Sequence, residues 1–358
     1  MKRYKLKLTA ITPIHIGTGE DYEPTNFVID GGYLYEFDEY KFYDKLDDRT
    51  KQLFLQAVES KLSDSLFAIH RVIKLNKQKA IECAISKVKV SKGIESYYQN
   101  RVGKAVQNEG GKKVKPSKVF NRFQIARTIR QPNSQKVYIP GSSIKGAFST
   151  AYQEKIYKQN PTLWRECFEK PLDNIFKNIL VSDTNVLKSS AKVGYVLNKE
   201  RFEEEPVGPS NKMEVIEVGS TFETIVSFRN YKTPKRVDFD FLQDACDKHY
   251  LKLFQQSFKP FTIFKGKKVD DFTNEYFPES FYEKYKDFQP KENQFIIRVG
   301  KHSGARAVTI EGIRKIKVRE SKYKTKILDQ ETTTWMFGEK ERDEKNLLPI
   351  GWVLCEIV

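Results

Sequence analysis

The stretch PGSSIKG (residues 140–146) combines residue types that bind phosphate groups. A Pro–Gly turn, two hydroxyl side chains and a lysine stand where a helix is expected to begin, and the free amide groups and dipole at a helix start attract anions. The order differs from the nucleotide-hydrolase pattern GxxxxGK[ST], because Lys145 precedes the second glycine and no hydroxyl residue follows it directly. We therefore predict that Gly141, Ser142, Ser143 and Lys145 hold an RNA phosphate and hydrolyse no nucleotide. The structural alternative is a serine-capped helix start with an exposed lysine.

Two side chains near the N-terminus, His15 and Asp30, have the chemistry needed for RNA cleavage. His15 lies in TPIHIGTG (residues 12–19), directly before a glycine loop, where an imidazole could act as general acid or base beside a phosphate. Asp30 could position a metal ion or activate a ribose hydroxyl. The simpler interpretations are a structural histidine and a tight hairpin turn at Asp30-Gly31-Gly32. Cleavage by His15 or Asp30 stays the alternative, and we predict no catalytic residue, metal site or cofactor.

The segment RVGKHSGARAVTIEG (residues 298–312) has the composition of a nucleic-acid contact loop. It contains three glycines together with Lys301, His302 and Arg306. Glycines let a phosphate backbone approach the main chain closely, and the cations neutralise it. The glycine spacing does not match the dinucleotide fingerprint GxGxxG. We predict that Lys301, His302 and Arg306 bind RNA.

Positive charge is concentrated in two segments of the chain. Lys and Arg number 63 against 47 Asp and Glu, a formal net charge of +16. Residues 101–136 contain ten basic residues and one acidic residue, and residues 298–326 contain ten basic and two acidic residues. These two segments hold the whole surplus, and such an excess favours a polyanionic partner. We predict that Arg122, Arg127 and Arg130 of the first segment also bind RNA.

Several classes of protein do not fit this sequence. The N-terminus MKRYKLKLTAI alternates polar and apolar residues, unlike a signal peptide. No segment approaches the roughly 20 apolar residues of a membrane helix. The four cysteines are far apart and form no CxxC pair, so neither a zinc site nor a disulfide framework is expected. We expect a protein of the reducing cytoplasm without a membrane partner.

The elements that would position these residues alternate between strand and helix. Period-two patterns and glycine turns predict strands at 4–11, 26–37, 178–183, 213–228, 294–300 and 352–358. Apolar residues at helical spacing predict helices over 39–74, from residue 142 onward and over 238–258. The pattern indicates an α+β protein with two ferredoxin-like domains, 1–205 and 206–358. Residues 86–136 have weak periodicity and many lysines, and we interpret them as a basic, partly mobile insertion.

Six motifs recur in this order in a known family: TPIHIGTG, YIPGSSIKGAFSTAY, LVSD, EVGSTFE, RVGKHSGA and LPIGW. Over almost its whole length the chain therefore resembles the RAMP superfamily of CRISPR proteins, for which IPGSSIKGA is specific. The RVGKHSGA loop and the TTTW and LPIGW ending are similar to one group of that superfamily, the end subunit of type III-A effector complexes.

This resemblance implies a fold related to the RNA-recognition motif and a non-catalytic, guide-binding role. The subunit would cap the 3′ end of the guide RNA at the end of the backbone filament. Its neighbours would be the backbone RAMP subunit and the small helical subunit, and host nucleases would be recruited for 3′ maturation. The resemblance makes Gly141, Ser142, Ser143 and Lys145 guide-backbone contacts and places His15 and Gly17 at the glycine-loop position. In the backbone subunits a loop aspartate cleaves target RNA, whereas Asp30 here stands in a tight turn.

Three functions thus remain open from the sequence. The first is the non-catalytic capping subunit, which the two basic segments and the glycine loop favour. The second is a RAMP endoribonuclease that uses His15 or Asp30. The third is an RNA-independent assembly protein whose basic segments bind acidic neighbours.

Overall fold

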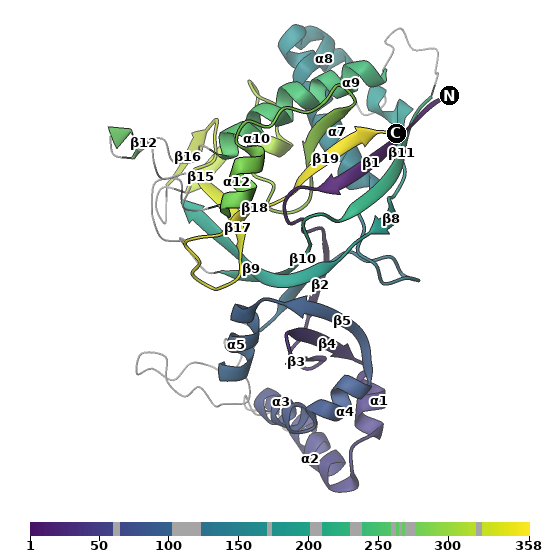
Figure 1. The fold of residues 1–358 in the computed structure, drawn as a ribbon, viewed down its shortest axis with the longest axis vertical. Helices are drawn as coiled ribbons and strands as arrows, with labels where there is room; N and C mark the ends of the chain where they lie inside the picture. Colours follow the sequence, from purple (N-terminus) through teal and green to yellow (C-terminus); the bar gives the residue numbers. More distant parts are fainter. Residues whose placement is uncertain are drawn as a thin grey trace.

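The structure is a computed structural model that describes residues 1–59, 65–101, 123–169, 174–200, 210–229, 238–258, 263–264, 267–268, 277–319 and 324–358. Two large sheets with helices packed against them confirm the expected α+β fold (Figure 1). No helix among these residues is long and apolar enough to cross a membrane.

The first sheet has six strands in the order β14-β19-β1-β11-β7, with β8 beside β11. Its strands are β1 (Lys2–Ala10), β7 (Ile179–Val181), β8 (Asn185–Lys188), β11 (Thr221–Phe228), β14 (Gln294–Arg298) and β19 (Trp352–Ile357). As the alternation of β1 predicts, Leu6 and Leu8 are fully buried. Strand β1 lies between β11 and β19 and is antiparallel to both.

Helices cover one face of this sheet and form the main core with it. They are α7 (Gly141–Gln159), α8 (Pro161–Phe168), α9 (Phe239–Cys246), the π-helix η3 (Asp247–Leu251), α10 (Lys252–Ser257) and α12 (Glu279–Tyr285). Phe295 of β14 is in contact with both Phe148 of α7 and Phe239 of α9, at ring-centroid distances of 6.0 and 6.2 Å. The helix expected over 238–258 contains a π-helical turn, η3, between α9 and α10.

The second sheet has nine strands, in the order β2-β6-β10-β9-β5-β4-β3 with β17 beside β9 and β18. They are β2 (Gly17–Tyr22), β3 (Phe27–Asp30), β4 (Tyr33–Phe37), β5 (Ala84–Val90), β6 (Ile125–Thr128), β9 (Ala191–Glu200), β10 (Asn211–Ile216), β17 (Thr333–Gly338) and β18 (Leu348–Pro349).

Five helices join β3, β4 and β5 in a separate lobe, drawn at the bottom of Figure 1. They are α1 (Glu39–Asp44), α2 (Asp48–Glu59), α3 (Ser65–Leu75), α4 (Lys77–Glu82) and α5 (Lys92–Arg101). This lobe has its own small core, which includes Val28, Phe37, Phe42 and Ile73. The shorter elements of the chain are η2 (Ile175–Asn178), η4 (Arg306–Val308), β12 (Ile263–Phe264), β13 (Lys267–Lys268), β15 (Ile316–Arg319) and β16 (Thr325–Leu328).

Each large sheet contains strands from both sides of residue 205. Strand β1 pairs with β11 and β19 in the first sheet, and β9 pairs with β10 and β17 in the second. The two sheets therefore do not correspond one to one to the expected segments 1–205 and 206–358. The boundary itself stays a prediction.

Parts of the segment 86–136, expected to be a basic insertion, form strands and a helix of the fold. Its beginning forms β5 and α5, and its end contains β6, all of which contribute buried side chains such as Val88, Ile94 and Ile125. The alternation of lysine and valine in SKVKVS is itself the period-two pattern of a half-buried strand, which the interpretation as an insertion overlooked. Only residues 102–122, the most basic part, lie outside the described residues.

Candidate nucleic-acid interface

The two glycine loops predicted from opposite ends of the chain lie against each other. The backbone amide of Lys301 donates to the carbonyl of His15 at 2.8 Å. Gly300 makes this approach possible, since it has φ +86° and an added Cβ would lie 2.4 Å from the His15 oxygen. The side chain of Lys301 is exposed.

The LPIGW motif closes the same arrangement. The Gly351 amide donates to the carbonyl of Pro13, and the Val299 amide donates to the carbonyl of Gly351, both at 2.8 Å. Residues 13–17, 298–304 and 348–352 therefore form one packed unit, which we call the loop cluster. Sequence order gives no sign of this convergence.

The imidazole of His15 is buried in the loop cluster and holds the protein together. It is 1% exposed, and its Nδ1 lies 2.7 Å from the carbonyl oxygen of Glu214, to which it donates when neutral. Burial lowers the pKa of His15, and the nearby Lys301 lowers it further. The His15 ring is therefore buried and bonded to the main chain of β10.

His302 lies beside it with a backbone in the left-handed region and a ring packed against a tryptophan. Its φ is +66°, and its ring is tilted by 40° to that of Trp335 at a centroid distance of 4.2 Å. Burial first, and then the positive charge of Lys301, lower the pKa of His302 to about 4. His302 is thus a neutral aromatic surface beside the exposed lysine.

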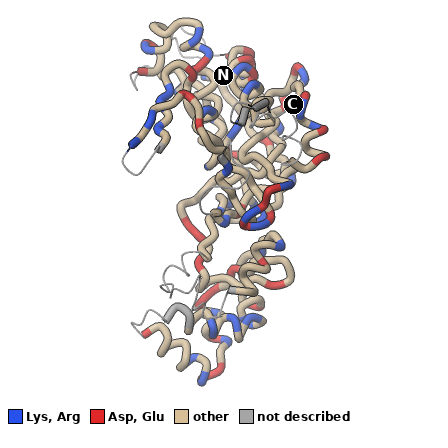
Figure 2. Tube along the Cα trace, turned by 90° about the vertical axis from the view of Figure 1, so that its left-hand side faces the viewer, with Lys and Arg blue, Asp and Glu red and all other residues tan. Residues whose placement is uncertain are grey.

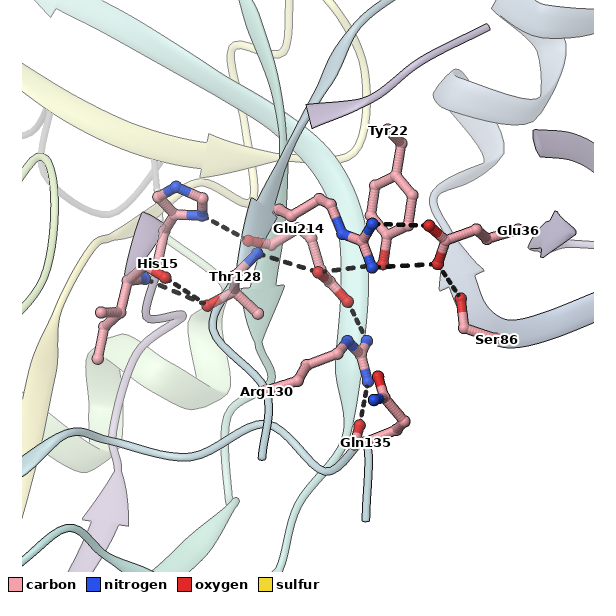
Figure 3. A network of polar contacts seen from close by, with 10 residues as sticks. His15, Tyr22, Glu36, Ser86, Thr128, Arg130, Gln135 and Glu214 are labelled. Atoms are coloured by element: carbon pink, nitrogen blue, oxygen red, sulfur yellow. Dashed lines mark hydrogen bonds and ion pairs between the residues drawn. The ribbon is translucent and has the colours of Figure 1, made fainter. Parts of the chain in front are cut away.

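A buried carboxylate, Glu214, joins the strands next to the loop cluster (Figure 3). Its Oε2 accepts from the Thr128 amide at 3.0 Å and the Tyr22 hydroxyl at 3.3 Å. Its Oε1 is paired with the guanidinium of Arg130, which also donates to the carbonyl of Gln135 at 2.6 Å. Strands β2, β6 and β10 are therefore tied to the segment that enters α7.

Arg127 forms a second internal pair. Its guanidinium binds Glu36 of β4 through contacts of 2.6 and 3.1 Å and lies 4.4 Å from the centre of the Tyr22 ring. The side chains of Arg127 and Arg130 are only 20% and 14% exposed. Both predicted RNA ligands thus have carboxylate partners inside the protein, and their contact with RNA stays a prediction.

The start of α7 differs from the predicted phosphate site in one respect. The serine cap of the structural alternative is wrong. The helix begins at Gly141, its cap residue is Pro140, and no side chain caps it. The Gly141 amide donates instead to Asp183 at 2.7 Å. An added Cβ at Gly141 would lie 2.3 Å from the carbonyl oxygen of Val181, so the glycine lets the LVSD segment close on the helix.

The other predicted residues of α7 face outward. Ser142 is exposed, and Ser143 and Lys145 are half-buried. Partial burial lowers the pKa of Lys145, and the like charge of the exposed Arg229 lowers it further. Two cations that repel each other beside a helix start form a place where an added anion is stabilising.

The remaining predicted residues lie elsewhere or outside the described chain. Asp30 ends β3 at the expected hairpin turn and pairs with Lys77 at 2.5 Å. No group of three or more His, Cys, Asp or Glu residues suited to a metal is found among the residues the structure describes. Arg306 pairs with Glu331 at 2.9 Å, Gly17 is exposed at the start of β2, and Arg122 lies outside the described residues. Figure 2 shows basic and acidic positions interspersed along the described trace.

Comparison with known proteins identifies the family. The family model of the RAMP superfamily matches residues 7–348. The chain belongs to the RAMP superfamily.

Two curated relatives of this RAMP protein carry the name CRISPR system Cms protein Csm5. The protein of Methanocaldococcus jannaschii is 27% identical over 158 residues, which is 44% of this chain and 32% of the relative. The protein of Streptococcus thermophilus is 27% identical over 206 residues, which is 51% of this chain and 52% of the relative. The matches therefore span about a third and about half of the relatives' lengths.

Two solved structures share the fold of this RAMP protein. A chain of the cryo-EM structure of a Csm–crRNA–target RNA ternary complex of a type III-A CRISPR-Cas system has a TM-score of 0.65 at 16% identity, over 99% of this chain and 100% of that chain. The crystal structure of T. onnurineus Csm5 has a TM-score of 0.54 at 17% identity, over 97% of this chain and 99% of that chain. Together with the family match they confirm the expected RAMP fold.

The sequence did not identify several residues of this candidate interface. Asp183 and Arg229 flank the start of α7, and Glu214 and Glu36 hold the two arginines. Asp183 is the aspartate of the LVSD motif, and this motif was the available signal for it. The acids that pair with Arg127 and Arg130 are remote in sequence, so no local pattern could identify them.

Proposed function

We propose that this RAMP protein is a non-catalytic subunit of a type III-A CRISPR effector complex that binds and caps the 3′ end of the guide RNA. The names of the curated relatives and the RNA-containing complex among the structural neighbours support the type of assembly. The exposed Lys301 and the half-buried Lys145, each within a family motif, support RNA as the ligand.

The observation that carries the proposal is the loop cluster. It brings the motifs TPIHIGTG, RVGKHSGA and LPIGW together and leaves the Lys301 side chain exposed beside the ring of His302. A cation next to an aromatic surface suits the phosphate and base of a nucleotide. Lys145 and Arg229 add two further cations at the start of α7.

Recognition in this proposal is independent of RNA sequence. Lys301, Lys145 and Arg229 would contact phosphates, and hydroxyl groups such as that of Ser142 would contact ribose. Such binding suits a subunit that holds guides with different spacers. It weakens as salt rises, because each neutralised phosphate releases counterions.

The geometry of His15 and Asp30 favours the non-catalytic role over the endoribonuclease. The His15 ring is buried and bonded to Glu214, and Asp30 is paired with Lys77 at a hairpin turn. Neither side chain is free to approach a scissile phosphate. In the proposal, 3′ maturation of the guide depends on host nucleases that the complex recruits in the cytoplasm, and the backbone RAMP and small helical subunits are its neighbours.

The direct test uses purified protein and an end-labelled guide-like RNA, with and without magnesium. Binding is followed on a native gel and integrity on a denaturing gel. We expect intact, shifted RNA, with affinity lowered about tenfold or more by Lys145→Glu or Lys301→Glu. The matched control is Lys41→Glu, an exposed lysine of α1 in the other lobe.

Two results would contradict the proposal. RNA cleavage that disappears in His15→Ala or Asp30→Ala would make the protein a nuclease. Equal RNA affinity in the Lys145, Lys301 and Lys41 variants, combined with lost binding to neighbouring subunits, would favour the assembly protein.

A further inference from the structure

A polar cavity lies on the helical side of the first sheet. It has a volume of about 490 Å³ and is lined by residues of α7, η3, α10, η4 and the segment after it, and by positions 329 and 330. This volume is within the range of about 300–1,000 Å³ that small-ligand sites occupy. Arg306 is the only residue of the cavity lining that the sequence singled out.

Glu154 of α7 lines the cavity and accepts hydrogen bonds from other groups of the protein. It is buried and accepts from His249 Nδ1 at 3.0 Å, from the Glu311 amide at 2.8 Å and from Lys158 at 2.9 Å. Burial alone would raise its pKa, but these partners, His249 first, lower the pKa of Glu154 to about 2. The carboxylate is ionised and committed, so it offers little to a cation in the cavity.

Two buried nitrogens in the same wall lack a partner. Neither His249 Nε2 nor Arg314 Nη1 has a hydrogen-bond partner in the described part of the chain. His249 is 4% exposed, and the Arg314 side chain is 7% exposed. A guanidinium is always charged and can only donate, so a buried nitrogen of this kind needs an acceptor.

The backbone around His249 is unusual. His249 lies in the π-helix η3, between α9 and α10, and π turns are rare and often found at functional sites. The next residue, Tyr250, is fully buried and donates to the carbonyls of Ala147 at 3.0 Å and Ala307 at 3.2 Å. These bonds fix the π turn against α7 and η4 and hold the His249 ring beside Glu154.

The cavity lining carries four cations, Lys248, Lys252, Arg306 and Arg314, and three acids, Glu154, Glu311 and Asp329. Two of the acids, Glu154 and Glu311, are also bound by Lys158. Lys252 is 61% exposed and lies 4.0 Å from Glu311. The two buried nitrogens without partners are thus inside, and an exposed cation is at the edge.

We propose that this cavity binds a phosphate group, with Arg314 Nη1 and His249 Nε2 as its inner contacts and Lys252 as a cation at its edge. The phosphate belongs to a mononucleotide or to a phosphorylated RNA end, which present the same chemistry. The Nδ1 of His249 is bonded to Glu154, so Nε2 is the ring nitrogen left for a ligand. The site does not depend on the guide-binding role proposed above.

Calorimetric titration of the full chain tests the site with three probes. These are inorganic phosphate, adenosine 5′-monophosphate, and one guide-like RNA carrying either a 3′-phosphate or a 3′-hydroxyl. The variants are Arg314→Gln and Lys252→Gln, with Lys286→Gln as the control, since Lys286 pairs with Glu283 on α12 away from the cavity. Thermal unfolding of each variant checks its folding.

We expect saturable binding of at least one probe that falls about tenfold or more in Arg314→Gln and about threefold in Lys252→Gln. Lys286→Gln should stay within about twofold of the parent protein. Binding of the mononucleotide identifies a small-molecule site, and preference for 3′-phosphate over 3′-hydroxyl RNA identifies an RNA-end site. No saturation with any probe, or affinity unchanged in both cavity variants, overturns the proposal. If Arg314→Gln does not fold, the Lys252→Gln result decides.

Discussion

The backbone amide of Lys301 donates a 2.8 Å hydrogen bond to the carbonyl of His15, which joins the glycine loops of the two halves of the chain. The contact involves only main-chain atoms, so it depends on how closely the two loops approach and not on the imidazole. Gly300 sets that approach. Lys301 is thereby held with its side chain exposed, next to the ring of His302.

The first prediction concerns Gly300. In Gly300→Ala the new Cβ meets the His15 carbonyl in a left-handed conformation, so we expect a loss of about 1–3 kcal/mol in the free energy of unfolding, measured in urea, and weaker RNA binding. Gly146→Ala is the control, because Gly146 lies in α7 with nothing within 4 Å of an added Cβ. It should be neutral or stabilise by up to about 1 kcal/mol. Equal stability in the two variants would contradict the close packing.

The second prediction concerns the buried pair of Arg130 and Glu214. Arg130→Met leaves a fully buried carboxylate without its cation, and we expect a loss of about 3–5 kcal/mol in unfolding free energy. Glu214→Gln in the same chain should recover part of this loss, because the charge is then gone. A double-mutant cycle by chemical unfolding measures the coupling. Additive effects of the two substitutions would show that the pair is not coupled.

The third prediction separates stability from RNA affinity at Asp183. Asp183→Ala removes the acceptor of the Gly141 amide and should cost about 1 kcal/mol in unfolding free energy. The same change removes a negative charge beside the start of α7, so RNA affinity should rise. Asp183→Asn keeps an acceptor oxygen without the charge, and we expect it to bind RNA more tightly at nearly full stability. Weaker RNA binding in both variants would show that Asp183 is itself part of the RNA site.

The fourth prediction concerns the pH dependence of the free energy of unfolding that Glu154 contributes. Its pKa falls from an ordinary value of 4.5 to about 2, so the folded state holds the proton less tightly than the unfolded chain. The stabilisation is complete above about pH 4.5 and is lost as the pH falls towards 2, by about 3 kcal/mol in all. We expect Glu154→Gln to lack this part of the acid transition. Identical slopes of unfolding free energy against pH in both proteins would contradict the role of Glu154.

The sequence by itself determined the local elements and the family. Alternation in KRYKLKLTA, the Gly-Gly turn after Asp30 and helical spacing after Ser143 reflect side-chain periodicity and turn geometry, which depend only on neighbouring residues. The six motifs in their order also identified the RAMP superfamily from the sequence alone. The PGSSIKG stretch correctly indicated a helix start, because a Pro–Gly break followed by apolar spacing is a local signal.

Tertiary structure decided what those residues contact. The motif loops at His15 and Lys301 are remote in sequence and meet only because β1 and β14, which precede them, both pair with β19. The basic residues looked equivalent as a sequence, yet Arg130 is committed to Glu214 while Lys301 remains exposed. From the sequence the Gly141 amide was expected to bind a phosphate, but in the fold it donates to Asp183. Partners of this kind come from distant strands, so charge composition alone cannot separate an internal ion pair from a surface that binds RNA.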